Sequence, residues 1–293
     1  MNEDKQDIIA VILTHNRKDM LLQGIHGLLN QSRPLDMIII VDSVSTDGTY
    51  DCLLASGVLD KAFIKYVRLE ENKGPSGGFA QGIAMAQSHS PSWIWILDDD
   101  IVAAPTCLEN LLKHKGVSRC IAPSRDEKTV PLFNPAVGFT SHSKALSFSS
   151  DKDVVFSNTC CFEGMLIHGD IVEKAGLPDE RFFQVNGDTI YGFVVSLFTN
   201  IAHVKNASIT RLLPQKKPLS NRRAYLLIRN HFLTRDYLKQ YGLLRPSFFY
   251  INFALIVFYY STIVAFRTKS PGMPFAVLKG LFHGIFKKFG APQ

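Results

Sequence analysis

The feature that most constrains the fold is an uninterrupted apolar run near the start of the chain, residues 8–13. Six apolar residues rich in β-branched side chains are typical of a strand that is buried on both faces of a parallel sheet. The same pattern predicts further strands at 37–41, 63–69 and 93–97, separated by helices at 20–29 and 78–87. Strands that alternate with helices predict an α/β fold, with a mostly parallel sheet, flanking helices and right-handed crossovers.

Polar side chains follow three of the predicted strands, at residues 14–17, 42–49 and 98–100. Each group alone also fits a tight turn or a solvated loop. Ligands of open α/β sheets bind at the carboxyl ends of the strands, so these groups are expected to meet at one edge. The site of the chemistry is therefore expected just after each strand.

The strongest of these groups is the carboxylate triplet Asp98, Asp99 and Asp100, which directly follows an apolar strand. Neighbouring carboxylates repel one another unless a cation offsets them, and hard oxygen ligands favour Mg²⁺ or Mn²⁺ over Zn²⁺. A divalent ion in this position is suited to bridging two phosphates and neutralising a departing diphosphate. The pattern thus indicates a displacement reaction with a nucleoside diphosphate as the leaving group.

The composition is that of a folded protein, with 293 residues, 46% hydrophobic and 20% charged. These values exclude a disordered or collagen-like chain. The five cysteines form no C-x-x-C pair, and the acidic first seven residues do not resemble a signal peptide, so we expect a reducing cytosol.

Charge divides the chain into two predicted domains, at 1–204 and 205–293. The first holds 17 Lys and Arg against 25 Asp and Glu, and the second holds 15 basic residues against the single acidic residue Asp236. A basic region could meet nucleic acid or an anionic membrane surface. The 19 uncharged residues 248–266 favour the membrane, and no nucleic-acid partner is expected.

The run 248–266 leaves three interpretations open. It is nearly long enough to span a bilayer, at about 1.5 Å of rise per residue, but it also fits an in-plane docking helix or a helix of the protein core. A second apolar stretch favours docking, although an amphipathic core helix has the same pattern. Its apolar residues recur at helical spacing with lysines between them: Leu278, Leu281, Phe282, Ile285, Phe286 and Phe289.

Five motifs in order, at residues 11–17, 41–49, 72–79, 95–100 and 176–183, resemble family 2 glycosyltransferases of the GT-A fold. These are inverting enzymes that use nucleotide sugars, and the resemblance covers about residues 7–240. The Asn-x-Gly-x-x-Gly-Gly-Phe segment, the Asp triplet and the Arg-Arg-Ala-Tyr segment are most similar to bacterial galactofuranosyl- and rhamnosyltransferases. Such enzymes commonly build surface polysaccharides from the cytoplasmic side of the membrane.

The resemblance implies a role for each matching residue. Thr14, Asn16 and Arg17 would border the nucleotide pocket, Asp42 would accept a hydrogen bond from the base, and Asn72, Gly77 and Gly78 would shape the wall near the ribose and donor sugar. His15 is interpreted as a loop residue without a catalytic task. Asp98 would lie near ribose or sugar hydroxyls, while Asp99 and Asp100 would hold Mn²⁺ or Mg²⁺.

The chain departs from the family pattern G-D-D-x-E at the position of the catalytic base: Asp188 is kept, but Thr189 and Tyr191 replace the other two acidic residues. A threonine hydroxyl does not accept protons near neutral pH, so Asp188 is the predicted base of an inverting transfer. A structural role for Asp188, a base at Glu163 and lost activity are the alternatives.

A second departure concerns a metal-ligating histidine of the family. Its place is occupied by Arg211, unless His203 is shifted into it. Arg211 could clamp a phosphate, or it could be one more cation of the basic region. On the following helix, Tyr225, Arg229, His231 and Arg235 either border an acceptor entrance or form a solvated basic face.

The sequence therefore predicts a glycosyltransferase. We expect it to move rhamnose or galactofuranose, with inversion, from UDP or dTDP to a glycan or lipid-linked acceptor. Its predicted location is cytoplasmic, peripheral on the inner face of the cell membrane. A degenerate GT-A domain that binds without catalysis, and a nucleotidyltransferase, are the competing hypotheses.

Overall fold

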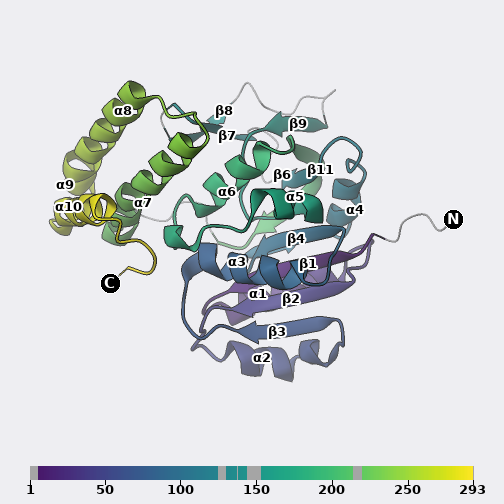
Figure 1. Ribbon diagram of the computed structural model, residues 1–293. Coiled ribbons are helices and arrows are strands. Elements are labelled where there is room, and N and C mark those ends of the chain that lie inside the picture. The colour runs from purple at the N-terminus through teal and green to yellow at the C-terminus, as the bar shows by residue number, and fades with distance from the viewer. Residues whose placement is uncertain (1–5, 125–129, 137, 144–152, 214–219, 293) are drawn as a thin grey trace.

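One large sheet runs through the protein in a computed structural model that describes residues 6–124, 130–136, 138–143, 153–213 and 220–292 (Figure 1). Its strand order is β3-β2-β1-β4-β10-β6-β11-β5, with β9 also paired to β11 and a separate β7-β8 hairpin. The strands are β1 (Ile8–Thr14), β2 (Met37–Asp42), β3 (Ile64–Arg68), β4 (Trp93–Asp98), β5 (Ile101–Ala103), β6 (Cys120–Ser124), β7 (Val130–Asn134), β8 (Phe139–Ser143), β9 (Val154–Ser157), β10 (Met165–His168) and β11 (Ile201–Arg211). The helices are α1 (Lys18–Leu29), α2 (Thr49–Ala55), α3 (Gly74–Gln87), α4 (Cys107–Leu112), α5 (Gly169–Ala175), α6 (Gly187–Ser196), α7 (Asn221–Gln240), α8 (Pro246–Tyr259), α9 (Ala265–Thr268) and α10 (Gly272–Ile285).

The first half of the sheet confirms the predicted α/β architecture. β1 pairs in parallel with β2 and β4, and β2 pairs in parallel with β3. Beyond β4 the sheet is mixed, because β10 runs antiparallel to both β4 and β6. The carboxyl ends of β1, β2 and β4 therefore lie side by side, and their polar loops meet there.

β1 shows why a continuous apolar run was needed. Alternate side chains point to opposite faces of a strand, and here both faces are covered by helices. Ile8 and Ile12 belong to the core that includes residues of α1, while Val11 and Leu13 belong to the core that includes residues of α3. Each is at most 7% exposed, so a polar residue at any of these positions would be buried.

Helix α3 approaches the sheet closely because it carries glycines on its buried face. A Cβ atom at Gly78 would lie 2.4 Å from Leu13 Cδ1, and one at Gly82 would lie 2.5 Å from Val11 Cγ1. The helix starts at Gly74, earlier than predicted, with a φ of +68° at that residue and Pro75 in its first turn. Gly74 is suited to this left-handed backbone because it has no Cβ.

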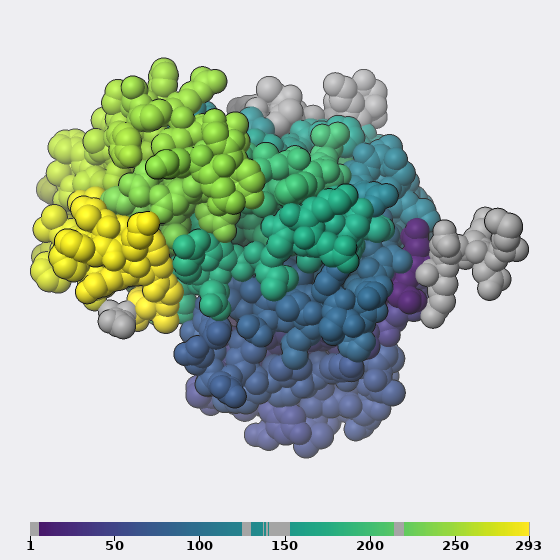
Figure 2. All heavy atoms as spheres, viewed as in Figure 1, coloured from purple at the N-terminus to yellow at the C-terminus, as the bar shows by residue number. Residues whose placement is uncertain are grey.

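The C-terminal helices α7 to α10 gather in a lobe beside the sheet, coloured green to yellow in Figures 1 and 2. Helix α10 packs against α7 through small residues: a Cβ at Gly280 would lie 2.8 Å from the Tyr225 carbonyl oxygen, and one at Gly284 would overlap the Phe232 ring. Met273 and Val277 are buried as well, but the predicted apolar face points outward, with Leu278, Phe282 and Ile285 exposed by 62%, 50% and 61%. The alternative of an ordinary amphipathic core helix is therefore wrong for α10.

A continuous helical segment, Pro246–Thr268, contains the apolar run 248–266. It comprises α8, the π-helical turn Tyr260–Val264 and α9. Among the described residues it is the helix that is long and apolar enough to cross a membrane. Its most apolar stretch of 18 residues has a mean hydropathy of 1.8, and only 11% of that stretch is buried. The core-helix interpretation of this run is therefore also wrong, while spanning and in-plane docking both remain predictions.

One further expectation, for helix α7, changes in the structure. The solvated basic face predicted on α7 is wrong, because Arg229 is 0% exposed and His231 is 1% exposed. His231 is stacked between the rings of Phe249 and Phe253, at centroid distances of 4.2 and 4.4 Å. The domain boundary after residue 204 remains a prediction from charge, but β11 continues across it to Arg211.

Candidate active site

Two adjoining cavities lie at the carboxyl ends of β1 and β4. The first, of about 270 Å³, is lined by the loops after β1 and β2 and by Asn72. The second, of about 510 Å³, is lined by Asp100, Glu163, Asp188 and Arg211. Both cavities are lined by Arg17, Pro75, Asp98, Gln184 and Arg222. Residues far apart in the sequence, from Leu13 to Arg223, thus form one cleft.

The loop after β1 is tied to the loop after β2. The Asn16 amide N–H donates to Ser45 Oγ at 2.9 Å, and the Thr46 N–H donates to Asn16 Oδ1 at 2.6 Å. His15 Nδ1 donates to the Ser43 carbonyl at 2.7 Å. Asn16 and His15 therefore shape the cavity wall through their contacts with the neighbouring loop.

Asp42 lies fully buried at the end of β2. Its Oδ1 accepts from the Ser45 N–H at 2.7 Å, and its Oδ2 accepts from Arg68 Nη1 at 3.2 Å and from the Tyr66 hydroxyl. Burial and the hydrogen bond to Asp42 raise the pKa of Tyr66, so this hydroxyl stays protonated as a donor. Asp42 thus holds the turn, and its neighbour Ser43 lines the cavity; base recognition by Asp42 remains a prediction.

Asp99 is bound into the protein by the loop after β1. Thr14 Oγ1 donates to its Oδ2 at 2.9 Å, and Arg17 Nη1 lies 2.6 Å from its Oδ1. Burial raises the pKa of Asp99, while the Arg17 charge acts in the opposite direction. Both carboxylate oxygens are engaged, which leaves Asp99 the least available metal ligand of the triplet.

Asp100 meets two guanidinium groups across the cleft. Its Oδ2 lies 3.6 Å from Arg211 Nε and 3.8 Å from Arg17 Nη1. Arg211 Nη2 also binds Glu163 Oε1 at 2.5 Å. Within the described residues, the buried Oδ1 of Asp100 has no hydrogen-bond partner.

Asp98 is a cleft carboxylate that is strongly affected by burial and by the negative charges around it. Burial, followed by the charges of Glu163 and Asp100, raises the pKa of Asp98 well above its usual range. In the described chain no hydrogen bond or salt bridge to a cation stabilises its charge. A cationic ligand would lower this electrostatic cost.

The donor chemistry of Asp98 and Asp100 fits Mg²⁺ or Mn²⁺. The unpartnered Asp100 Oδ1 is a hard oxygen, and Mg²⁺ is commonly held by one or two carboxylates together with substrate phosphates. In the part of the chain that the structure describes, no three His, Cys, Asp or Glu side chains are arranged so that they alone could hold a metal ion. A divalent ion bound here would therefore take its remaining ligands from the substrate and water.

The predicted base, Asp188, lies in the first turn of α6 and lines the second cavity. Its Oδ1 accepts from the Thr189 N–H at 2.7 Å, and its charge contributes to the raised pKa of Asp98. The alternative base Glu163 is bound to Arg211 in the same cavity. Asp188, by contrast, has no cation within salt-bridge distance among the described residues.

Several predicted residues lie outside the lining of the cleft, among them Asn16 and Asp42, which support the loops beside it. Gly77 and Gly78 are buried on α3, where Gly78 packs on Leu13, while Gly74, Pro75 and Ser76 line the cleft in their place. His203 lies in β11, with its Nε2 2.8 Å from Ser157 Oγ and 3.2 Å from the Thr159 carbonyl. Arg211, at the end of that strand, reaches Asp100 instead.

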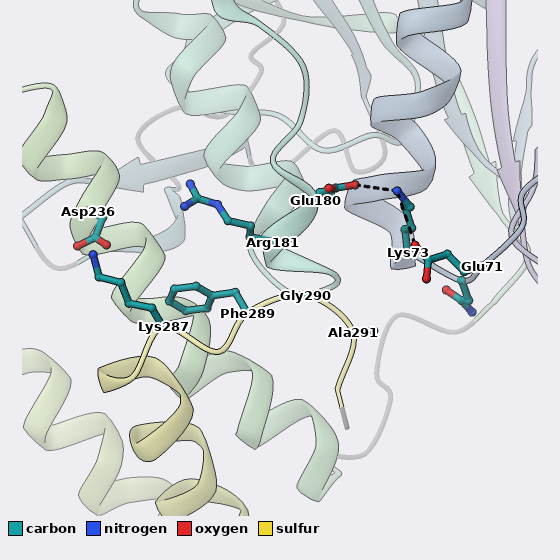
Figure 3. A pocket seen from close by; sticks show the side chains of 10 residues that line it. Glu71, Lys73, Glu180, Arg181, Asp236, Lys287, Phe289, Gly290 and Ala291 are labelled. Carbon is teal, nitrogen blue, oxygen red and sulfur yellow. Dashed lines mark hydrogen bonds and ion pairs between the residues drawn. The ribbon is translucent and has the colours of Figure 1, made fainter.

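Some cleft residues were not assigned a role from the sequence. Gln184 and Arg222 line both cavities, and Arg223 lines the second. The Arg222-Arg223 pair belongs to the Arg-Arg-Ala-Tyr segment that resembles the family. It is far from the Asp triplet in the sequence, and no sequence pattern indicates that the two meet in the fold. A third cavity of about 440 Å³ lies between the start of α3 and the C-terminal tail (Figure 3).

We predict that Arg17→Met lowers the free energy of unfolding by about 2 kcal/mol, because Asp99 is left buried without its cation. This loss is smaller than that expected for a fully buried ion pair, because the Arg17 side chain is one-third exposed. Adding Asp99→Asn should restore about half of the loss. Urea denaturation measures both, with Lys113→Met as the control for an exposed pair, expected to cost less than about 1 kcal/mol. Equal losses in Arg17→Met and Lys113→Met would contradict a structural role for this pair.

Comparison with known proteins agrees with this geometry. Residues 9–153 match the family model "Glycosyl transferase family 2". The galactofuranosyltransferase GlfT1 of Mycolicibacterium smegmatis is 30% identical over 194 residues, which span 62% of this chain and 63% of the relative's length, less than two thirds.

Solved structures share the fold at low sequence identity. GalNAc-T7 with UDP, GalNAc and Mn²⁺ superposes with a TM-score of 0.63 at 15% identity, covering 96% of this chain and 54% of that one. The mannosyltransferase PcManGT from Pyrobaculum calidifontis, in complex with GDP-Man and Mn²⁺, gives 0.60 at 13% identity, covering 98% and 89%. The chain therefore shares the GT-A fold of these structures, and its residues 9–153 match glycosyl transferase family 2.

Proposed function

We propose that the protein is an inverting glycosyltransferase that moves a sugar, galactofuranose or rhamnose, from a nucleoside diphosphate to a glycan or lipid-linked acceptor. The observation that carries this proposal is the gathering of Asp98, Asp100 and Asp188 in one cleft with Arg17 and Arg211. The similarity to a galactofuranosyltransferase supports the choice of sugar class.

The first cavity is the proposed donor nucleotide site. It is bordered by Thr14 and Arg17, which the family resemblance assigned to the nucleotide pocket, and by Asn72, which it assigned to the wall near the ribose and donor sugar. The solved structures that share the fold contain UDP or GDP-Man with Mn²⁺, which supports a nucleotide-sugar donor, here UDP or dTDP. Asp98 and Asp100 would hold Mn²⁺ or Mg²⁺ at the passage to the second cavity.

The second cavity is the proposed site of transfer. The acceptor hydroxyl attacks the anomeric carbon, Asp188 accepts its proton, and the bond to the nucleoside diphosphate breaks on the opposite face of the sugar. When bound, the divalent ion neutralises the charge that develops on the diphosphate. Arg17 and Arg211 lie within 4 Å of Asp100 and can also bind diphosphate oxygens.

A binding protein without catalysis is the second candidate. The altered segment 187–191 favours it, because Asp188 is the one carboxylate that remains there. Both candidates predict nucleotide binding, so turnover decides between them.

We predict that the wild-type protein releases nucleotide from a UDP- or dTDP-sugar in the presence of Mn²⁺ and an acceptor. Asp188→Asn should lower kcat by about 100- to 10,000-fold with little change in nucleotide affinity, since the base acts in the transition state. Asp100→Asn should weaken both turnover and Mn²⁺-dependent nucleotide binding.

The control is Asp51→Asn, on the exposed side of α2, which should keep wild-type turnover. Turnover is measured by detection of released nucleotide, and nucleotide affinity by calorimetry. Full activity in Asp188→Asn would exclude it as the base, and nucleotide binding without turnover over a broad acceptor panel would favour the binding protein.

We further propose that the lobe of α7 to α10 docks on an anionic membrane surface, on the cytoplasmic side. Large side chains on α8 and α10 are exposed, among them Phe248 at 64%, Phe275 at 73% and Phe282 at 50%. Exposed apolar surface of this extent marks an interaction site, and the net positive charge of residues 205–293 complements anionic lipid.

We predict that the protein sediments with vesicles containing phosphatidylglycerol, and less with phosphatidylcholine alone. Phe275→Asp with Phe282→Asp should lower the bound fraction at least tenfold, because each loses the transfer energy of a buried phenylalanine. Leu54→Asp, at an exposed apolar position on α2, is the matched control. Undiminished vesicle binding by the double variant would rule out this face of the lobe.

A further inference from the structure

The loop that leads into α6 has an unusual backbone. Phe183, Val185 and Asn186 all have positive φ angles, of +58°, +63° and +68°. Residues with a Cβ disfavour this region, especially β-branched ones, and persist there only when the surroundings hold them. The loop leads directly into the first turn of α6, which carries Asp188, so whatever holds this backbone also sets the position of the proposed base.

One fully buried amide on α7 binds this loop. Asn230 Nδ2 lies 2.9, 2.7 and 2.8 Å from the carbonyl oxygens of Phe182, Gln184 and Val185, which share its two N–H hydrogens. Asn230 itself is 0% exposed. Three backbone carbonyls from one short stretch thus contact a single side chain, which holds the strained turn in place.

The neighbouring Arg229 connects the same loop to the tail that follows α10. Its guanidinium donates to the Phe182 carbonyl at 3.2 Å and to the Gly290 carbonyl at 2.7 Å, and it also binds Asn230 Oδ1. The Gly290 N–H in turn donates to the Arg181 carbonyl at 3.0 Å. Figure 3 shows the tail with Gly290 running beside the segment that carries Arg181.

The same loop also touches the donor side of the cleft. The Ser76 N–H at the start of α3 donates to the Phe183 carbonyl at 3.1 Å, and a Cβ at Gly187 would overlap Ser76 Oγ. Gln184 lines both cavities. A shift of the loop would therefore move the base and the cavity wall together, relative to the donor.

We propose that Asn230 and Arg229 are positioning residues for the transfer reaction: they hold residues 182–187 so that Asp188 faces the donor, and they couple this loop to the tail that follows α10. The proposal rests on the proposed function, because it assigns Asp188 its task. It also gives the helical lobe a role in the active site as well as at the membrane.

The test compares kcat, nucleotide affinity and thermal stability of the full-length protein. Asn230→Ala should lower kcat about 10- to 100-fold, because small misplacement of a catalytic group is costly, while UDP affinity stays within about threefold. The matched control is Thr234→Val, a second buried polar residue on α7, which should leave kcat and UDP affinity near wild type. Deuterium exchange should show loss of protection in residues 183–188 of Asn230→Ala alone.

The coupling to the tail is tested with Gly290→Pro. Proline lacks the N–H that binds Arg181 and cannot adopt the φ of +92° found at Gly290. This variant should lower kcat at least threefold and increase exchange in residues 183–188, again with UDP affinity kept. Ala291→Val, one residue further along the exposed tail, is the control and should behave as wild type.

The outcomes separate this proposal from the proposed function. A wild-type protein that binds UDP but transfers no sugar overturns the function and, with it, this role for Asn230. An active wild type with unchanged kcat in Asn230→Ala overturns the positioning role alone. Parallel loss of kcat, UDP affinity and thermal stability in Asn230→Ala would also overturn it, by showing a general structural role; unchanged kcat in Gly290→Pro would overturn the coupling.

Discussion

The rest of the site depends on the repulsion among carboxylates at the end of β4. Asp98, Asp99 and Asp100 follow a strand that must be buried, and Glu163 and Asp188 approach from other elements. Arg17 and Arg211 offset part of this charge, but the pKa of Asp98 is still raised well above its usual range. The cleft is therefore built at an electrostatic cost that a bound cation would relieve.

The parallel half of the fold and most of the cleft were predictable from sequence because both follow from local patterns. The run 8–13 predicted a doubly buried strand, and the triplet after Leu97 predicted a carboxylate cluster at its rim. Gly78 was assigned to the donor wall, because sequence cannot distinguish a glycine that admits a ligand from one that admits Leu13. The contacts of Asn230 and Arg229 were also out of reach, since they join segments about 45 to 60 residues apart.

The C-terminal lobe shows that one apolar pattern fits two different environments. In α10, helical periodicity is compatible with a docking face and with a buried core face, but Gly280 and Gly284 make the contact with α7 while Leu278, Phe282 and Ile285 are exposed. Small residues at helix contacts with large apolar residues facing out are typical of helices in contact with lipid. Periodicity therefore locates an apolar face on such a helix, but the exposed fractions of its side chains show whether that face packs on protein.

The most direct test of this account is a crystal structure of the protein with UDP and Mn²⁺. The account predicts the nucleoside in the cavity lined by Thr14 and Asn72, with the diphosphate beside Asp98, Asp100 and Arg211. A nucleotide bound elsewhere, such as in the cavity of Figure 3 between α3 and the tail, would contradict it.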